Sequence, residues 1–363
     1  MLATVPMRLS AFAVFSMLFA GAALSQAAQQ SSAPPAAVQT PAQAPSLTVD
    51  RDPVRSPDGE PPALQVLRKE GDGYVLRTDV DEVALNCTVL DGNRMVPDLK
   101  KENFQVSEDG VRQKIISFQH TDLPVSIALV VDNSGSMARK RPSVNKSTLD
   151  LIAASKPQDE AFVVNFNDTA FIDQEFTSDV NKLRAGLSHV EARGGTALYD
   201  AVAASADKLA TDAKNPKQVI ILITDGEDNS STITKEQAIR RVQQLSGPVI
   251  YSIGLLFGDE DMSHDDVKKA RRALEELSTE TGGMAFFPKN IEQIDQIAAE
   301  VARDIRNQYT LGYHSTKPTT EPGFRRVLVT AEGKGQGKLL VRTRTGYFPV
   351  ARVVKQAAAP EKK

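Results

Sequence analysis

Three short polar segments of this chain carry residue types that could bind a metal ion. In the first, Asp132, Ser134 and Ser136 occupy alternate positions directly after the apolar run 127–131. An unbroken apolar run predicts a strand that is buried on both faces, as in a parallel sheet. Open α/β sheets bind their ligands at the carboxyl ends of such strands. A ligand set made only of oxygen atoms suits a hard divalent cation, Mg²⁺ above all.

Two later segments add oxygen groups. Gly194 and Gly195 predict a flexible turn, and Thr196 follows them where an amphipathic helix begins. Asp225 follows a second apolar run, 219–224, and stands at a turn. Two buried strands that each end in an aspartate, with a Gly-Gly-Thr loop between them, form a three-part pattern. We expect the three segments to converge at one edge of the sheet.

Each of these residues also has a structural interpretation when it is taken alone. Asp132 and Asp225 can be turn residues after strands, Thr196 can cap a helix, and the two serines can satisfy backbone groups of their loop. All five residues, in this order and in these strand contexts, favour metal binding over the local roles. An EF-hand that begins at Asp225 is excluded, because its sixth position is serine and a strand precedes it.

The three-part pattern resembles the metal-ion-dependent adhesion site of von Willebrand factor type A domains. All five positions of the family pattern are matched. The resemblance implies one bound Mg²⁺, or Mn²⁺ or Ca²⁺, with the hydroxyls in direct contact and one or both aspartates acting through water. It also implies an open coordination position, which a carboxylate of a partner protein fills. The implied metal ligands are Asp132, Ser134, Ser136, Thr196 and Asp225.

The segment after Ser136 departs from the family pattern, in which a helix follows at once. Here three basic residues, Arg139, Lys140 and Arg141, precede Pro142. Proline disfavours helix at the residue before it, so we expect the first helix to start late, at Pro142, or to be kinked. We expect the three cations near the mouth of the metal site. They would either attract an acidic partner or form a solvated basic loop.

Strands and helices alternate through the central part of the chain. This alternation predicts an α/β domain with a Rossmann-like, mostly parallel sheet that carries helices on both faces. Apolar runs predict its strands near 125–131, 161–166, 219–224, 248–254 and 284–288, with a short antiparallel strand near 170–176 at or near an edge. Amphipathic patterns predict helices near 143–154, 179–188, 197–212, 234–245, 266–280 and 291–307.

β-rich segments flank this domain. The first flank, 71–123, contains predicted strands at 74–77, 83–90, 104–108 and 113–119, with Asp-Gly turns at 91–92 and 109–110. The second flank, 308–350, contains predicted strands at 309–313, 324–331 and 339–344. Neither flank is long enough to bury a good core alone. We therefore expect both to fold together as one small β-sandwich, with residues 124–307 inserted between them. Short phrases in both flanks resemble a bacterial subgroup of secreted proteins that carry this domain.

The N-terminus has the pattern of a targeting segment. Arg8 precedes an apolar core, and residues 25–27 form a small-x-small cleavage site, so residues 1–27 are predicted to be a signal peptide. The alternative is an uncleaved membrane anchor, for which the apolar core is slightly short. Residues 28–70 are rich in Pro, Ala and Gln and predict a disordered linker, and residues 351–363 predict a loose tail. We expect a secreted or periplasmic protein without a membrane span after cleavage.

Composition excludes several other function classes. A net charge of −3 and the lack of a basic stripe with interleaved aromatic residues argue against nucleic-acid binding. The sequence lacks two patterns that would indicate an enzyme: a G-x-S-x-G motif, and histidines at the spacing of metal ligands. One alternative is a Mg²⁺-dependent phosphohydrolase of the haloacid dehalogenase type, but that class requires an aspartate where this chain has Ser134. A purely structural metal site is another. The sequence favours a non-enzymatic protein-binding module for adhesion or scaffolding.

Overall fold

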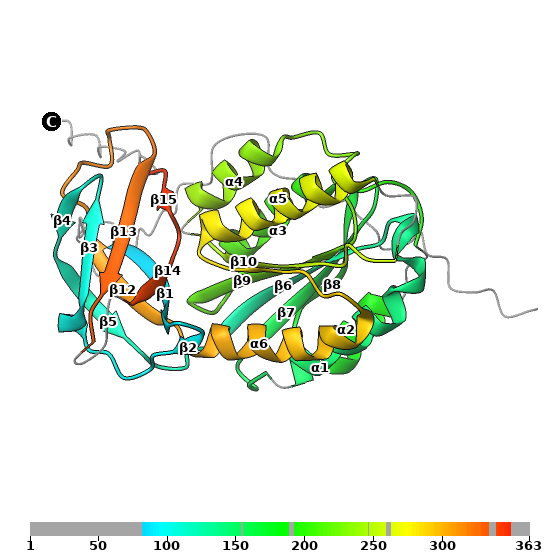
Figure 1. Cartoon of the computed structure of the whole chain (residues 1–363), viewed down its shortest axis with the longest axis horizontal. Coiled ribbons are helices and arrows are strands. Elements are labelled where there is room, and N and C mark those ends of the chain that lie inside the picture. Colours follow the sequence, from blue (N-terminus) through cyan, green and yellow to red (C-terminus); the bar gives the residue numbers. More distant parts are fainter. Residues whose placement is uncertain are drawn as a thin grey trace, which may run out of the picture. The chain divides into compact units, whose positions relative to one another are not determined.

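The computed structural model describes residues 82–349, with the exception of 154, 189–191, 246, 259–262 and 334–338. The predicted signal peptide, linker and tail, and the predicted strand at 74–77, lie outside the described residues. The described residues form an α/β region and a β-rich region (Figure 1).

A six-stranded sheet in the order β11-β10-β9-β6-β7-β8 forms the centre of the α/β region. Its strands pair in parallel except for β8, which pairs antiparallel with β7 at one edge. Every residue of β6 is buried, as expected for a central parallel strand that is covered on both faces. The predicted sheet and its antiparallel edge strand are therefore confirmed. The strands are β6 (Val125–Asp132), β7 (Glu160–Phe166), β8 (Ala170–Thr177), β9 (Lys217–Thr224), β10 (Val249–Gly254) and β11 (Ala285–Phe286).

Helices cover both faces of this sheet, with α1, α2 and α6 on one side and α3, α4 and α5 on the other (Figure 1). Alternate residues of β6 enter two different cores: Leu129 packs in the first and Val130 in the second. No helix in the described ranges is both long enough and apolar enough to cross a bilayer. The helices are α1 (Arg141–Ala153), α2 (Val180–Ser188), α3 (Leu198–Asp212), α4 (Lys235–Gln244), α5 (His264–Thr281) and α6 (Ile294–Arg306), and the 3₁₀ turns are η1 (Lys101–Asn103), η2 (Gly135–Arg139) and η3 (Ile291–Gln293).

Strands from the two flanks alternate in two sheets. One sheet has the order β14-β1-β12-β5, with β2 paired to β1, and the other has the order β15-β13-β3-β4. Because β12 lies between β1 and β5, and β13 lies between β15 and β3, neither flank forms its sheet alone. The expectation that the flanks fold together is confirmed. The strands are β1 (Glu82–Asp91), β2 (Arg94–Met95), β3 (Phe104–Glu108), β4 (Val111–Gln113), β5 (Ile115–Gln119), β12 (Tyr309–His314), β13 (Arg325–Ala331), β14 (Leu340–Arg342) and β15 (Gly346–Tyr347).

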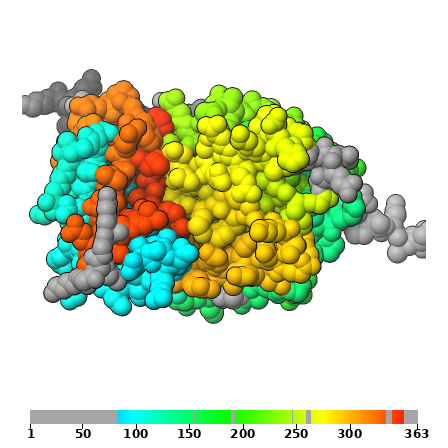
Figure 2. All heavy atoms as spheres, in the orientation of Figure 1, coloured from blue at the N-terminus to red at the C-terminus, as the bar shows by residue number. Residues whose placement is uncertain are grey.

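The two flanks share one apolar core, in which Leu85 and Val106 of the first flank pack with Tyr309 of the second. Their surfaces also lie side by side in the space-filling view, where the first flank is cyan and the second orange to red (Figure 2). One predicted element is wrong. The run 113–119 is not a single strand, because the chain leaves one sheet after Gln113 and enters the other at Ile115.

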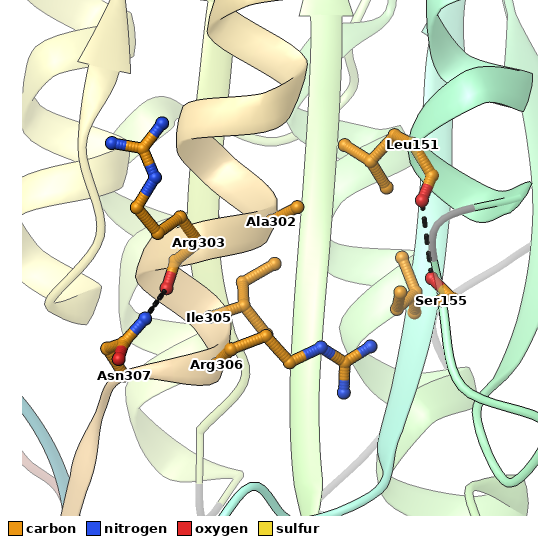
Figure 3. Close-up of a pocket in the computed structure, with 8 residues that line it drawn as sticks. Leu151, Ser155, Ala302, Arg303, Ile305, Arg306 and Asn307 are labelled. Atoms are coloured by element: carbon orange, nitrogen blue, oxygen red, sulfur yellow. Dashed lines mark hydrogen bonds between the residues drawn. The ribbon is translucent and has the colours of Figure 1, made fainter.

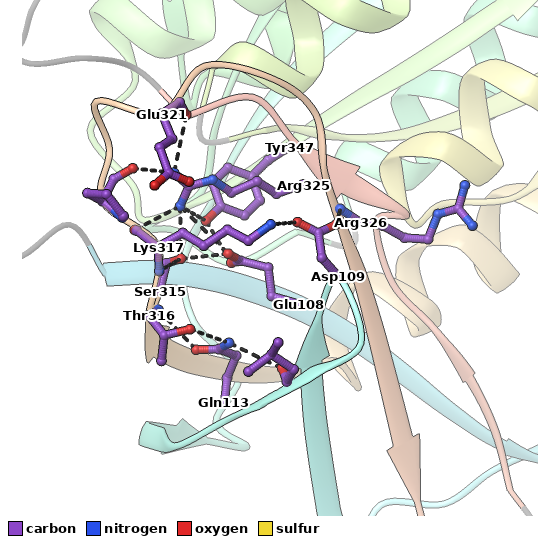
Figure 4. Close-up of polar contacts among 12 residues, drawn as sticks. Glu108, Asp109, Gln113, Ser315, Thr316, Lys317, Glu321, Arg325, Arg326 and Tyr347 are labelled. Atoms are coloured by element: carbon purple, nitrogen blue, oxygen red, sulfur yellow. Dashed lines mark hydrogen bonds and ion pairs between the residues drawn. The ribbon is translucent and has the colours of Figure 1, made fainter.

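A buried carboxylate links the flanks through polar contacts. Glu108, at the end of β3, is 1% exposed and accepts hydrogen bonds from the hydroxyls of Tyr313 (2.8 Å), Tyr347 (2.9 Å) and Ser315 (2.6 Å). The guanidinium of Arg325 lies 3.6 Å from the same carboxylate (Figure 4). All four partners belong to the second flank. Since a buried charge is costly unless it is paired and hydrogen-bonded, this network favours the joint fold of the two flanks.

Candidate metal centre

The three polar segments meet at the carboxyl ends of neighbouring strands. Asp132 is the last residue of β6, and Asp225 directly follows β9, which pairs in parallel with β6 up to Val131 and Ile223. Parallel neighbours end at the same edge of a sheet, so the two carboxylates are brought together by the strand pairing itself. Thr196 stands two residues before α3.

Hydrogen bonds join the first and third segments into one cluster. The hydroxyl oxygens of Ser134 and Ser136 lie 3.1 Å apart, and the Ser136 hydroxyl donates to Oδ1 of Asp225 at 2.8 Å. Oδ1 of Asp132 accepts from the backbone N–H of Ser134 at 2.7 Å, and its Oδ2 accepts from the hydroxyl of Thr224 at 2.5 Å. Both oxygens of Asp132 are therefore held in fixed directions.

The Gly-Gly-Thr segment is bound to both of the other segments. The backbone N–H of Gly135 donates to the carbonyl of Gly194 at 3.3 Å. The backbone N–H of Thr196 donates to Oδ1 of Asn229 at 2.8 Å, and the N–H of Asn229 donates back to the Thr196 carbonyl at 3.0 Å. A Cβ added to Gly226 would lie 3.8 Å from Oγ1 of Thr196. The threonine hydroxyl thus stands beside the turn that begins at Asp225.

A neighbouring carboxylate that the sequence analysis missed packs against the glycine pair. Asp168, in the turn between β7 and β8, accepts a 2.7 Å hydrogen bond from the N–H of Gly195. Gly194 has φ +78°, and a Cβ at that position would lie 2.2 Å from Oδ2 of Asp168. Any side chain at Gly194 would meet both backbone strain and a steric clash. A lone aspartate in a short loop carries no sequence signal for such a contact.

Burial divides the cluster into a deep side and an open side. Asp132, Asp225 and Thr196 are 0%, 1% and 4% exposed, whereas Ser136 is exposed. Burial raises the pKa of Asp132 to about 6, and the charge of Asp225 acts in the same direction, while hydrogen bonds from Thr224 and Ser134 oppose the rise. The cluster is reached from solvent on the side of Ser136.

The basic residues after Ser136 are not the exposed group that we expected. Arg139 is exposed, but Lys140 and Arg141 are only 9% and 6% exposed. The ammonium of Lys140 forms a 2.6 Å ion pair with Oδ2 of Asp225. The guanidinium of Arg141 donates to Oδ1 of Asn165 and to the backbone, both at 2.8 Å. The expectation of a solvated basic loop is therefore wrong for Lys140 and Arg141, because both side chains turn inward to satisfy buried acceptors.

The first helix starts late, as expected, but it includes Arg141, where helix was expected to be disfavoured. Residues Gly135–Arg139 form the 3₁₀ turn η2, and α1 begins at Arg141, one residue before Pro142. A proline in the first turn of a helix is tolerated, because the N–H that it lacks would have no partner within the helix. The extra turn gives the chain room to direct Lys140 toward Asp225.

The donor set fits a hard divalent cation. It consists of two carboxylates and three hydroxyls, all oxygen, which are the ligands that Mg²⁺, Mn²⁺ and Ca²⁺ prefer over zinc-type sulfur and imidazole ligands. The hydroxyl of Ser136 lies within hydrogen-bonding distance of the Ser134 hydroxyl and of Oδ1 of Asp225. These oxygens therefore belong to two loops that the fold has already brought together.

A separate hollow lies far from this cluster. It has a volume of about 260 Å³ and lies between α1 and α6, where Ile127, Leu151 and Ile305 form apolar walls and Arg306 stands nearby (Figure 3). Ile127 is near the amino end of β6, whereas Asp132 is at its carboxyl end. The hollow is therefore not part of the candidate metal centre.

Comparisons with known proteins agree with the fold of the α/β region. The family model for the von Willebrand factor type A domain matches residues 127–227. The chain is 25% identical over 305 residues to inter-alpha-trypsin inhibitor heavy chain H4 of Homo sapiens. The aligned region covers 74% of this chain and 31% of that protein. It is 29% identical over 170 residues to calcium-activated chloride channel regulator 3A-1 of Mus musculus. The aligned region covers 44% of this chain and 17% of that protein.

A solved von Willebrand factor type A structure from Catenulispora acidiphila is 15% identical, with a TM-score of 0.43, and the match covers 70% of this chain and 73% of that one. This chain spans less than a third of the length of either curated relative. The family match runs from β6 to the turn after β9, and so includes the segments that carry Asp132, Thr196 and Asp225. The chain therefore contains a von Willebrand factor type A domain.

Proposed function

We propose that this chain is a secreted or periplasmic protein-binding module that acts in adhesion or scaffolding. In this proposal a divalent cation, Mg²⁺ or else Mn²⁺ or Ca²⁺, joins the chain to an acidic side chain of a partner protein. The observation that carries the proposal is the hydrogen-bonded run from Ser134 through Ser136 to Asp225, which joins two loops and has the exposed residue Ser136 as its middle member. The proposed ligands are Asp132, Ser134, Ser136, Thr196 and Asp225.

The residues of the cluster have distinct tasks in this proposal. The hydroxyls of Ser134, Ser136 and Thr196 would contact the ion, and Asp132 and Asp225 would balance its charge directly or through water. Asp132 also holds the loop, because it accepts the backbone N–H of Ser134. When bound, the ion supplies the positive charge that attracts a carboxylate. The exposed side at Ser136 is where a partner would approach.

Two further observations support the proposal. Protein binding is a common activity of von Willebrand factor type A domains, which is the domain matched here. The signal-peptide pattern at residues 1–27 supports a location outside the cytoplasm. The metal and the partner are tested in separate steps.

The first step measures binding of Mn²⁺ alone, by isothermal calorimetry and by electron paramagnetic resonance. We expect the wild-type chain to bind one ion and Asp132→Asn to lose it. Asp150→Asn, on the exposed side of α1, is the matched control and should bind as the wild type does. Equal Mn²⁺ binding by Asp132→Asn and the wild type would contradict the proposed site.

The second step is capture of proteins from envelope extract of the source cells, with Mg²⁺ or with EDTA. We expect a captured protein that is lost both in EDTA and with Asp132→Asn. Capture that survives both changes would rule out the metal-bridged mode of binding. Hydrolysis of p-nitrophenyl phosphate that requires both Mg²⁺ and Asp132 would favour a phosphohydrolase instead.

A further inference from the structure

The ammonium group of Lys140 is surrounded by groups that bind cations. It lies 2.6 Å from Oδ2 of Asp225 and donates to the carbonyl of Leu255 at 3.1 Å. The ring of Phe257 faces it, with 5.6 Å between Nζ and the ring centroid. The side chains of Lys140 and Asp225 are 11% and 0% exposed. A carboxylate, a carbonyl and an aromatic face therefore surround this charge, largely away from water.

Both oxygens of Asp225 are engaged by groups of the chain itself. Oδ1 accepts from the hydroxyl of Ser136, and Oδ2 is paired with Lys140. A divalent ion that used Asp225 would meet a carboxylate whose charge is already balanced. A positive charge this close to the metal centre also repels the ion itself, and the effect is strong because the surroundings are buried.

The next residue acts on the other carboxylate. Arg141 is buried, and its charge interacts with that of Asp132. The arginine NH1 atom is buried and has no hydrogen-bond partner among the described residues. Two consecutive residues at the junction of η2 and α1 thus bring a positive charge near each of the two aspartates of the cluster.

We propose that Lys140 is an internal counter-cation that competes with the divalent ion for Asp225 and keeps the metal affinity of the centre low. This inference rests on the metal binding proposed above. A lowered affinity means that the centre fills only where the concentration of divalent ions is high. It also makes filling of the centre depend on release of the Lys140–Asp225 ion pair.

The test compares Mn²⁺ dissociation constants by isothermal calorimetry for the wild type, Lys140→Met and Arg139→Met. Lys140→Met removes the buried charge and keeps much of the side-chain volume. We expect it to bind Mn²⁺ at least about ten-fold more tightly. Arg139→Met removes an exposed charge from the adjacent position and should change the affinity by less than about three-fold.

A second measurement does not depend on the loaded site. In EDTA, urea unfolding should show Lys140→Met to be less stable than the wild type, because Asp225 is left as a buried charge without its partner. Saturating Mn²⁺ should raise the midpoint of Lys140→Met more than that of the wild type. If Lys140→Met does not fold, Lys140→Gln, which keeps a hydrogen-bond donor without the charge, takes its place.

The outcomes separate the two proposals. Equal Mn²⁺ affinity in the wild type, Lys140→Met and Arg139→Met would overturn the role of Lys140 and leave the metal centre intact. Weaker binding by a folded Lys140→Met would also overturn it, since Lys140 would then support the ligands. Absence of Mn²⁺ binding in every variant at millimolar concentration would overturn the metal centre itself, and the role of Lys140 with it.

Discussion

The hydroxyl of Ser136 donates a 2.8 Å hydrogen bond to Oδ1 of Asp225, across 89 positions of the sequence. One residue follows a central strand, and the other follows the strand next to it. The contact depends on the sheet order, because it exists only if β6 and β9 are neighbours. It also places the hydroxyl of an exposed residue against a buried carboxylate, which is the arrangement that the proposed metal centre requires.

Ser136→Ala should therefore weaken metal binding without unfolding the chain. We expect Mn²⁺ affinity to fall at least about ten-fold, since loss of even an indirect support of a metal ligand costs that much. The fold should persist because Ser136 is exposed. Ser155→Ala, whose hydroxyl only donates to the carbonyl of Leu151 near the far end of α1, is the matched control. Equal Mn²⁺ affinity in the two variants would contradict the ligand role of Ser136.

Gly194→Ala should disturb both stability and metal binding. Its φ of +78° is unfavourable for alanine, and the new Cβ would meet Asp168 at 2.2 Å. We expect a loss of about 1–3 kcal/mol in the free energy of unfolding, together with weaker Mn²⁺ binding. Gly92→Ala is the matched control, because Gly92 also has a positive φ, +58°, but nothing lies within 4 Å of its added Cβ. Equal losses in the two variants would show that the clash with Asp168 is unimportant.

Glu108→Ala should destabilise the β-rich region strongly. It would leave Arg325, which is 3% exposed, without its buried counter-charge, and three hydroxyls without their acceptor. Removing one partner of a buried ion pair costs about 3–5 kcal/mol. Glu102→Ala, at an exposed position of η1, should cost less than about 0.5 kcal/mol. Urea unfolding measures both, and a loss below about 1 kcal/mol for Glu108→Ala would contradict the role given to this network.

Much of the fold could be predicted because burial leaves a simple pattern. A strand covered on both faces must be apolar throughout, so β6 and β9 stand out in the sequence. The sequence also indicated which loops follow those strands, and hence which polar residues lie at the shared edge. The pairing of flank strands was harder, because alternation predicts a strand without naming its partner. The break between Gln113 and Ile115 was missed for that reason.

The directions of polar side chains could not be predicted. Lys140 lies in a basic run, and the chemistry of that run is the same whether its side chains face water or an aspartate 85 positions away. Only the three-dimensional position of Asp225 decides between the two. Asp168 was missed for the same physical reason, since it supports the site by accepting a hydrogen bond from the backbone N–H of Gly195, which lies 27 positions away.

Lys217 gives a prediction about pH. Its side chain is 3% exposed, and its ammonium donates to the carbonyl of Ile305 at the end of α6. Burial lowers the pKa of Lys217 to about 8, and the nearby charge of Arg306 acts in the same direction. Between about pH 8 and pH 10.5 the unfolded chain holds a proton that the folded chain has released. The contribution of Lys217 to the free energy of unfolding should therefore rise with pH across this window.

The measurement is urea unfolding of the wild type and Lys217→Met at about pH 7.5 and about pH 9.5. The wild type should gain about 2 kcal/mol relative to Lys217→Met between these two values, because the cost of burying the charged form disappears. Other groups that titrate in this range are present in both chains and cancel in the difference. Lys214→Met, at an exposed position just before β9, should show no such gain. A difference between wild type and Lys217→Met that stays constant with pH would mean that Lys217 keeps its ordinary pKa in the folded chain.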